Sequence, residues 1–273
     1  MMLFHHKNRK LKLTEIPHIQ INGQKIELVN DFKFLGIKID SHLTWAPLTN
    51  LIANKLSRVN GILHKLKHFL PPTILLIIYN ALFHSHLTYG ITSWGHTTTN
   101  NSRIGKIPKK AIRAINNSKY NSHTTPIFKT LGFLNLEDNF KLSCFKFYHK
   151  YKQLHIPKYF INMFTPAQTI NRDATLPSRP RRTIKPPSRY ADTIHDLPYT
   201  QNDIKIETTN KKYTRTCIRH LIPKLKNEEY LPEIILTKLD THSPKGFTTY
   251  VKKHILSTYD PICHIINCYT CNQ

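Results

Sequence analysis

Residues 32–45 constrain the fold more than any other part of the chain, because strand-like sequence ends there and helix-like sequence follows. The stretch reads Phe-Lys-Phe-Leu-Gly-Ile-Lys-Ile-Asp-Ser-His-Leu-Thr-Trp. Apolar residues on both faces of 32–39 predict a strand that is covered on both sides. Gly36 at its centre predicts a bulge or a close backbone approach. Upstream, Asn22-Gly23 between alternating flanks predicts a β-hairpin over 19–28.

Helical periodicity dominates the next segment. We expect Thr44 to cap a helix that tolerates Pro47 in its first turn. Its apolar residues keep helical spacing: Leu48, Leu51, Ile52, Leu56, Val59, Leu63 and Leu66. Pro71-Pro72 should end this helix and start another. The nearly continuous apolar run 74–87 then predicts a central buried helix, and 91–101 should be a polar loop around Trp94.

A third helical segment, 103–115, separates apolar from basic side chains. Its apolar stripe is Ile104, Ile107, Ala111 and Ile115, and its opposite face carries Arg103, Lys106, Lys110 and Arg113. Pro108 would cost ~3 kcal/mol inside a helix, so the regular helix should begin at Pro108. The basic face is a candidate phosphate-binding surface, and the alternative is an ordinary solvated helix face.

Helix-capping residues predict two further helices before the composition changes. One is capped by Thr125 and closed by Gly132, and a longer one starts after Asn135. Beyond these, proline and arginine dominate, which is typical of an extended basic linker. Helical periodicity returns later, with a helix from Ser243-Pro244 that carries Phe247, Val251 and Ile255.

These segments predict a mostly α fold with a short β-hairpin and strand at its start. We expect four parts: a β region over 1–45, a helical domain over 46–160, a basic Pro-rich linker over 161–205, and a small helical C-terminal module over 206–273. No internal repeat is evident.

Charge indicates the partner more clearly than the fold. The chain has 40 Lys and Arg against 16 Asp and Glu, a formal charge of +24, so we expect it to bind nucleic acid. No apolar run reaches the ~20 residues that span a bilayer, and no amphipathic anchor is evident, so we expect no membrane partner. The N-terminus does not resemble a signal peptide, and the five cysteines suggest reduced thiols. We therefore expect an intracellular protein that is not secreted. Nuclear action is a further option, although the chain lacks a dense basic import signal.

Three cysteines near the C-terminus form a candidate metal site. Cys268 and Cys271 have the two-residue spacing that suits Zn²⁺, and Cys263 is a third candidate ligand. A fourth ligand would have to come from elsewhere, such as His254. The alternative is a tail with free thiols. We expect no other cofactor for this chain.

Several motifs in order resemble the reverse transcriptase of non-LTR (LINE-type) retrotransposons. The first is the Phe34-Leu-Gly36 strand. The others are Gly61-Ile-Leu-His-Lys-Leu, Ile78-Tyr-Asn-Ala-Leu, Leu87-Thr-Tyr-Gly-Ile-Thr-Ser-Trp-Gly, Lys109-Lys-Ala-Ile-Arg-Ala-Ile and Pro126-Ile-Phe-Lys-Thr-Leu-Gly. Together they cover most of residues 1–160. Pro108 departs from the family, which usually has a helix-compatible residue there.

The resemblance implies an RNA-directed DNA polymerase in which residues 1–45 end the palm and 46–160 form the thumb. It implies that Phe34, Leu35 and Gly36 belong to the primer grip. The family holds Mg²⁺ with an early palm Asp and a Tyr/Phe-Ala-Asp-Asp hairpin upstream of that strand, and this sequence contains neither. Residues 189–193 echo the hairpin but lack its second Asp.

Three hypotheses follow for function. The leading one is a fragment of such a reverse transcriptase, inactive as a polymerase by itself but still able to bind template–primer nucleic acid. The second is a host-retained nucleic-acid or protein-binding scaffold derived from a thumb domain. The third is a translated remnant of a mobile element without a function.

Overall fold

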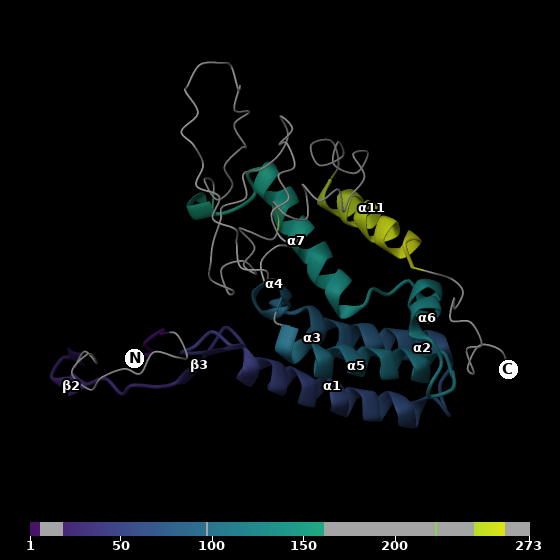
Figure 1. Cartoon of the computed structure of the whole chain (residues 1–273), viewed down its shortest axis with the longest axis horizontal. Coiled ribbons are helices and arrows are strands. Elements are labelled where there is room, and N and C mark those ends of the chain that lie inside the picture. Colours follow the sequence, from purple (N-terminus) through teal and green to yellow (C-terminus); the bar gives the residue numbers. More distant parts are fainter. Residues whose placement is uncertain (6–18, 97, 161–221, 223–242, 260–273) are drawn as a thin grey trace, which may run out of the picture.

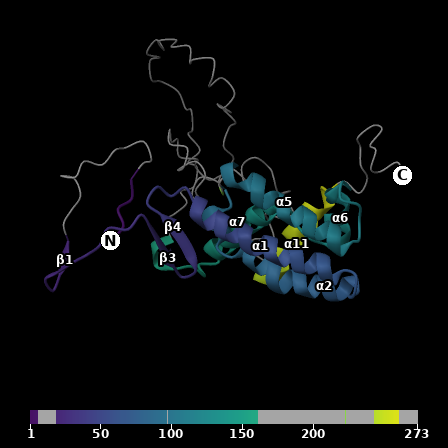
Figure 2. The ribbon, with the colours of Figure 1, turned by 90° about the horizontal axis from the view of Figure 1, so that it is seen from below.

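The fold is mostly helical, with two small antiparallel strand pairs at its start (Figure 1). The computed structural model describes residues 1–5, 19–96, 98–160, 222 and 243–259, and only the backbone for 98–103. The predicted linker over 161–205 lies outside the described residues. Figure 2 shows the strand pairs beyond one end of the helical body.

The first strand pair confirms the predicted N-terminal hairpin. Strand β1 (Gln20–Ile21) pairs antiparallel with β2 (Gln24–Lys25), and Ile21 lies opposite Gln24. Asn22 and Gly23 form the turn with φ angles of 50° and 77°. Two successive positive φ angles are the geometry that favours Asn-Gly in a two-residue turn.

The predicted single strand over 32–39 is wrong, because the chain reverses in the middle of it. Strand β3 (Asp31–Phe34) pairs antiparallel with β4 (Ile37–Asp40), and Phe34 lies opposite Ile37. Leu35 and Gly36 form the turn with φ angles of 46° and 82°. All of β3 is exposed, so the strand is not covered on both sides and Gly36 serves a turn rather than a bulge.

Asp40 fixes the step from strand to helix. Its carboxylate accepts hydrogen bonds from the Thr44 and Trp45 backbone amides, at 3.0 and 2.9 Å, and from the Thr44 hydroxyl at 2.9 Å. Helix α1 (Ala46–Leu66) follows, with Trp45 as its N-cap residue in the left-handed conformation. The N-cap residue is therefore Trp45 rather than the predicted Thr44, whose hydroxyl still accepts a hydrogen bond from the Ala46 amide at 3.3 Å. The carboxylate of Asp40, four residues before Thr44, holds the turn.

The segment predicted as one buried helix is divided and only half covered. It contains α2 (Pro72–Ile78), the π-helical segment η2 (Tyr79–His84) and α3 (Ser85–Thr88). One face is buried in the core, through Leu75, Tyr79, Phe83 and Leu87. The other face is exposed at Ile74, Ile77 and Leu82, because α1, α5 and α7 approach from one side only.

The predicted loop around Trp94 is also wrong. Residues 91–94 form the short helix α4 (Ile91–Trp94), whose Trp94 is fully buried, and α5 (Thr98–Ile115) starts four residues later. Helix α5 continues through Pro108 instead of beginning there. Packing offsets the cost of the proline, since Pro108 itself is buried and the predicted apolar stripe faces the core.

Helices α6 (Thr124–Leu131) and α7 (Leu136–Lys152) complete the body before the short 3-10 helix η3 (Lys158–Phe160). Asn135 caps α7 as predicted, accepting a hydrogen bond from the Asp138 amide at 2.8 Å. Thr125 does not cap α6, because the helix already includes Thr124 and His123 precedes it without a side-chain bond.

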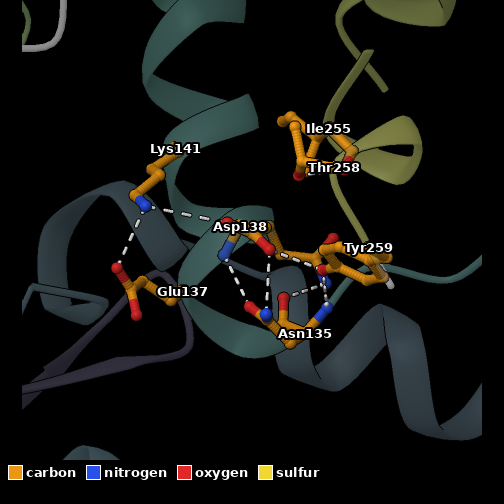
Figure 3. Close-up of polar contacts among 8 residues, drawn as sticks. Asn135, Glu137, Asp138, Lys141, Ile255, Thr258 and Tyr259 are labelled. Carbon is orange, nitrogen blue, oxygen red and sulfur yellow. Dashed lines mark hydrogen bonds and ion pairs between the residues drawn. The ribbon is translucent and has the colours of Figure 1, made fainter. Parts of the chain in front are cut away.

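Helix α11 (Pro244–Ser257) packs against α7, with Phe247, Val251 and Ile255 buried as the sequence predicts. Figure 3 shows the contact that fastens its end to the start of α7. The Tyr259 hydroxyl donates to Asp138 Oδ2 at 2.5 Å and accepts from the Asn135 amide at 3.0 Å. The Lys129 ammonium donates to the Tyr259 carbonyl at 2.6 Å.

Replacing Asp40 tests the strand-to-helix connection. D40A removes three hydrogen bonds at a buried position, so it should lower the free energy of unfolding by about 1–3 kcal/mol in urea denaturation. Asp31 faces Asp40 across the hairpin but only pairs with Lys38 at 3.0 Å near the surface. D31A is thus a matched control and should cost less than about 1 kcal/mol. Equal losses would contradict the role of Asp40.

Candidate nucleic-acid interface

The β3–β4 hairpin is held by the corner between α3 and α4. The Tyr89 hydroxyl donates a hydrogen bond to the Leu35 carbonyl at 2.5 Å. Gly90 has a φ of 59°, and a Cβ atom there would lie 2.7 Å from Ile37 Cδ1. The Trp94 indole donates to the Tyr89 carbonyl at 3.1 Å, so a buried side chain orients the corner. The hairpin therefore has a defined position relative to the helical body.

The predicted primer-grip residues lie at and beside the tip of this hairpin. Leu35 is 74% exposed and Phe34 is 58% exposed, and Phe32 on the same strand is 55% exposed. Gly36 turns beneath Tyr89, since a Cβ atom there would lie 3.5 Å from the tyrosine ring. The tip thus presents apolar and aromatic side chains that another molecule can reach.

Two of the four predicted basic residues on α5 remain available to a ligand. Lys106 and Lys110 are exposed and lie one turn apart. Arg113 is half-buried, and its Nε donates to the Ser122 carbonyl at 2.8 Å. Burial lowers the pKa of Arg113, opposed by Tyr120. We assign Arg113 to holding the loop after α5, and the Arg103 side chain lies outside the described residues.

The structure adds basic neighbours that our sequence reasoning missed. Burial lowers the pKa of His64, and the charges of Lys67, Lys110 and His68 lower it further. The end of α1 therefore lies beside α5, and we call these residues, His64, Lys67, His68 and Lys110, the Lys110 cluster. The run His64-Lys-Leu-Lys-His68 is the sequence signal that could have found it.

Acidic residues are missing from this part of the sequence. No Asp or Glu lies between Asp40 and Glu137, a stretch that includes all of α1 and α5. Lys55, Arg58 and Lys65 add exposed positive charge along α1. Among the described residues, Lys38 pairs with Asp31, and Lys141 pairs with Glu137 and Asp138. These pairs therefore do not neutralise the positive charges of the lysines and arginines on α1 and α5.

The hairpin tip and the Lys110 cluster lie toward opposite ends of α1. Strand β4 ends at Asp40, shortly before α1 begins, whereas His64 lies in the last turn of α1 and Lys67 is its C-cap residue. A helix of 21 residues is about 30 Å long. The structure therefore does not bring the two predicted groups together, but places them about one helix length apart.

The candidate zinc ligands Cys263, Cys268 and Cys271 lie outside the described residues. Within the part of the chain that the structure describes, no three His, Cys, Asp or Glu side chains are grouped to hold a metal ion. His254, the suggested fourth ligand, lies on α11. Over the same described part, no helix is long and apolar enough to cross a membrane.

Comparison of the chain with protein-family models, with curated proteins and with solved structures found no match. We therefore infer function from the geometry and charge of the described residues and from the order of the motifs.

Two alanine substitutions of glycine should have opposite effects. G36A forces a side chain into the left-handed region at the hairpin tip and should destabilise the protein by about 1 kcal/mol. Gly61 is an exposed position inside α1, where an added Cβ meets nothing within 4 Å. G61A should therefore stabilise by about 0.5–1 kcal/mol through helix propensity. Thermal unfolding measures both, and a stabilising G36A would contradict the turn.

Proposed function

We propose that this chain is a polypeptide related to non-LTR retrotransposon reverse transcriptases, and that its thumb-like helices bind a template–primer duplex. The observation that carries the proposal is the stretch between Asp40 and Glu137, which contains no Asp or Glu and places exposed basic side chains on α1 and α5. A positively charged surface attracts a polyanion over several ångströms and raises its rate of association. Phosphate contacts of this kind give affinity without reading sequence.

The separation between the hairpin tip and the Lys110 cluster suits a duplex better than a compact ligand. The length of α1, about 30 Å, corresponds to roughly nine base pairs at 3.4 Å per step. In this arrangement the Lys110 cluster contacts phosphates, and the hairpin tip with Phe34, Leu35 and Gly36 contacts the primer strand at the other end. Exposed aromatic rings such as Phe32 and Phe34 also offer faces on which an unpaired base can stack.

The contacts between motifs support the relationship to reverse transcriptases. The Phe34-Leu-Gly36 motif and the Leu87–Gly95 motif are far apart in the sequence, yet Tyr89 bonds to Leu35 and Gly90 fits beneath Ile37. The palm-like hairpin is thus fixed to the thumb-like helices. Since the family's Asp motifs are not in this sequence, we propose binding without polymerisation, and primer extension with Mg²⁺ should yield no product.

A protein-binding scaffold is the second candidate function. It is favoured by the exposed apolar face of α2 and η2, where Ile77 is 62% exposed, and by Phe69 just before α2, which is 82% exposed. Under this alternative, substitutions on the basic face would leave binding of the partner protein unchanged, whereas I77K would abolish that binding.

The salt dependence of duplex binding tests the leading proposal. K106Q combined with K110Q removes two phosphate contacts, so the slope of log affinity against log salt should become shallower by about two. Fluorescence anisotropy with a labelled primer–template duplex measures this slope from the full chain.

Lys141 provides the matched control, because Glu137 already pairs with it at 3.0 Å. K141Q should leave the slope nearly unchanged. Binding that does not depend on salt, or an equal effect of K141Q, would contradict the proposed interface.

Binding should also take up a proton at His64. In the free protein, burial and the neighbouring cations hold the pKa of His64 below its usual value. A phosphate beside the Lys110 cluster cancels that repulsion and raises the pKa, so binding should strengthen as the pH falls from about 7.5 to about 5.5. H64Q should reduce this pH dependence, whereas H155Q, an exposed histidine beyond α7, should not. An unchanged profile in H64Q would rule out the linkage.

A further inference from the structure

A cleft of about 280 Å³ lies between η2, α7 and α11, apart from the nucleic-acid interface. Its lining includes Asn80 and His84 from η2, Phe133 before α7, Lys146 from α7, and Thr248 and Lys252 from α11. Figure 1 shows α7 and α11 on the other side of α5 from α1. The cleft is therefore built from different helices than the Lys110 cluster.

Two lysines face this cleft without an acidic partner. Burial lowers the pKa of Lys146, and the charges of Lys252 and Lys150 lower it further. No Asp or Glu lines the cleft, and no ion pair involves Lys146 or Lys252 among the residues that the structure describes. The Lys252 ammonium lies 6.0 Å from the centre of the Phe133 ring. Two converging cations without a counter-charge favour an anionic ligand.

His84 also lines this cleft, and one of its ring nitrogens is buried. Its Nδ1 is buried and has no hydrogen-bond partner among the described residues. Burial lowers the pKa of His84, and Lys252 and Lys146 lower it further. A neutral imidazole next to two ammonium groups can donate one hydrogen bond to an oxyanion.

The hydroxyl groups of the cleft are already used as donors. Thr88 donates to the His84 carbonyl at 2.8 Å, Ser143 to the Asn139 carbonyl at 2.8 Å, and Thr248 to the Pro244 carbonyl at 2.7 Å. Of the lining amides, Asn139 Nδ2 donates to two carbonyls, whereas Asn80 Nδ2 donates only to the Leu76 carbonyl at 3.0 Å. The donors that remain for a ligand are thus the two lysines, His84 and the second amide hydrogen of Asn80. η2 is a π-helical segment, and such segments are frequent at functional sites.

We propose that this cleft binds a phosphomonoester, with the phosphate between Lys146 and Lys252. A phosphomonoester carries about −1.5 to −2 charges near pH 7, which matches two lysines better than a single carboxylate does. The cleft volume lies near the lower end of ligand pockets, so it suits a ligand no larger than about one nucleotide. The phosphate can belong to a free mononucleotide or to the 5′ end of a strand. This inference does not depend on the proposed function.

Calorimetric titration of the full chain tests the site with four defined probes: AMP, adenosine, and one short oligonucleotide with either a 5′-phosphate or a 5′-hydroxyl. AMP should bind and adenosine should not. The phosphorylated oligonucleotide should bind more tightly than its hydroxyl form, a comparison in which contacts with the Lys110 cluster cancel. A larger gain in affinity from the 5′-phosphate of the oligonucleotide than from the phosphate of AMP would identify the strand end as the ligand, and the reverse order would identify the nucleotide.

Variants separate the cleft from general charge effects. K146M and K252M should each weaken AMP binding by about tenfold or more, whereas K146R should keep most of it. Lys253 is the neighbour of Lys252 on α11 but does not line the cleft, so K253M is the matched control. Equal binding of AMP and adenosine, or an equal loss in K253M and K252M, would overturn the proposal. Duplex binding that fails while AMP still binds would reject the proposed function and leave this site in place.

Discussion

The contact between the hairpin tip and the Tyr89–Gly90 corner fixes the position of the β3–β4 hairpin on the helical body. A two-stranded hairpin has little stability of its own, so it needs a partner surface. Tyr89 provides a hydrogen bond to Leu35, and Gly90 leaves room for Ile37. Buried Trp94 holds the corner through the Tyr89 carbonyl. The exposed apolar tip is therefore presented by the helical core rather than by a flexible arm.

The helical core also carries excess positive charge on α1 and α5, and neither helix contains an acidic residue that could neutralise it. Between Asp40 and Glu137 the sequence has no acidic residue, and the Lys110 cluster brings two lysines and two histidines together. Such repulsion lowers the stability of the isolated protein, and a bound polyanion would remove it. Two buried carboxylates stabilise local structure instead. Asp40 accepts hydrogen bonds at the start of α1, and Asp138 accepts one from the Tyr259 hydroxyl.

Local rules predicted the parts of the fold that depend on neighbours in sequence. The Asn22-Gly23 hairpin, the apolar stripe of α1, the Asn135 cap and the helix after Ser243 follow from turn chemistry and periodicity. The failures involve residues whose environment is set from far away. Leu35 adopts a left-handed turn that leucine disfavours, with its carbonyl held by Tyr89. Pro108 stays inside α5 in a tightly packed environment, and Arg113 bonds to a loop carbonyl instead of facing a ligand.

The central claim is that the α1–α5 surface binds the phosphates of a nucleic-acid duplex. Chemical acetylation followed by mass spectrometry measures how reactive each lysine is. The comparison is made with and without a bound primer–template duplex. The account predicts protection of Lys67, Lys106 and Lys110, with Lys150 on α7 and Lys253 on α11 still modified. Uniform protection, or protection that leaves Lys106 and Lys110 fully reactive, would contradict it.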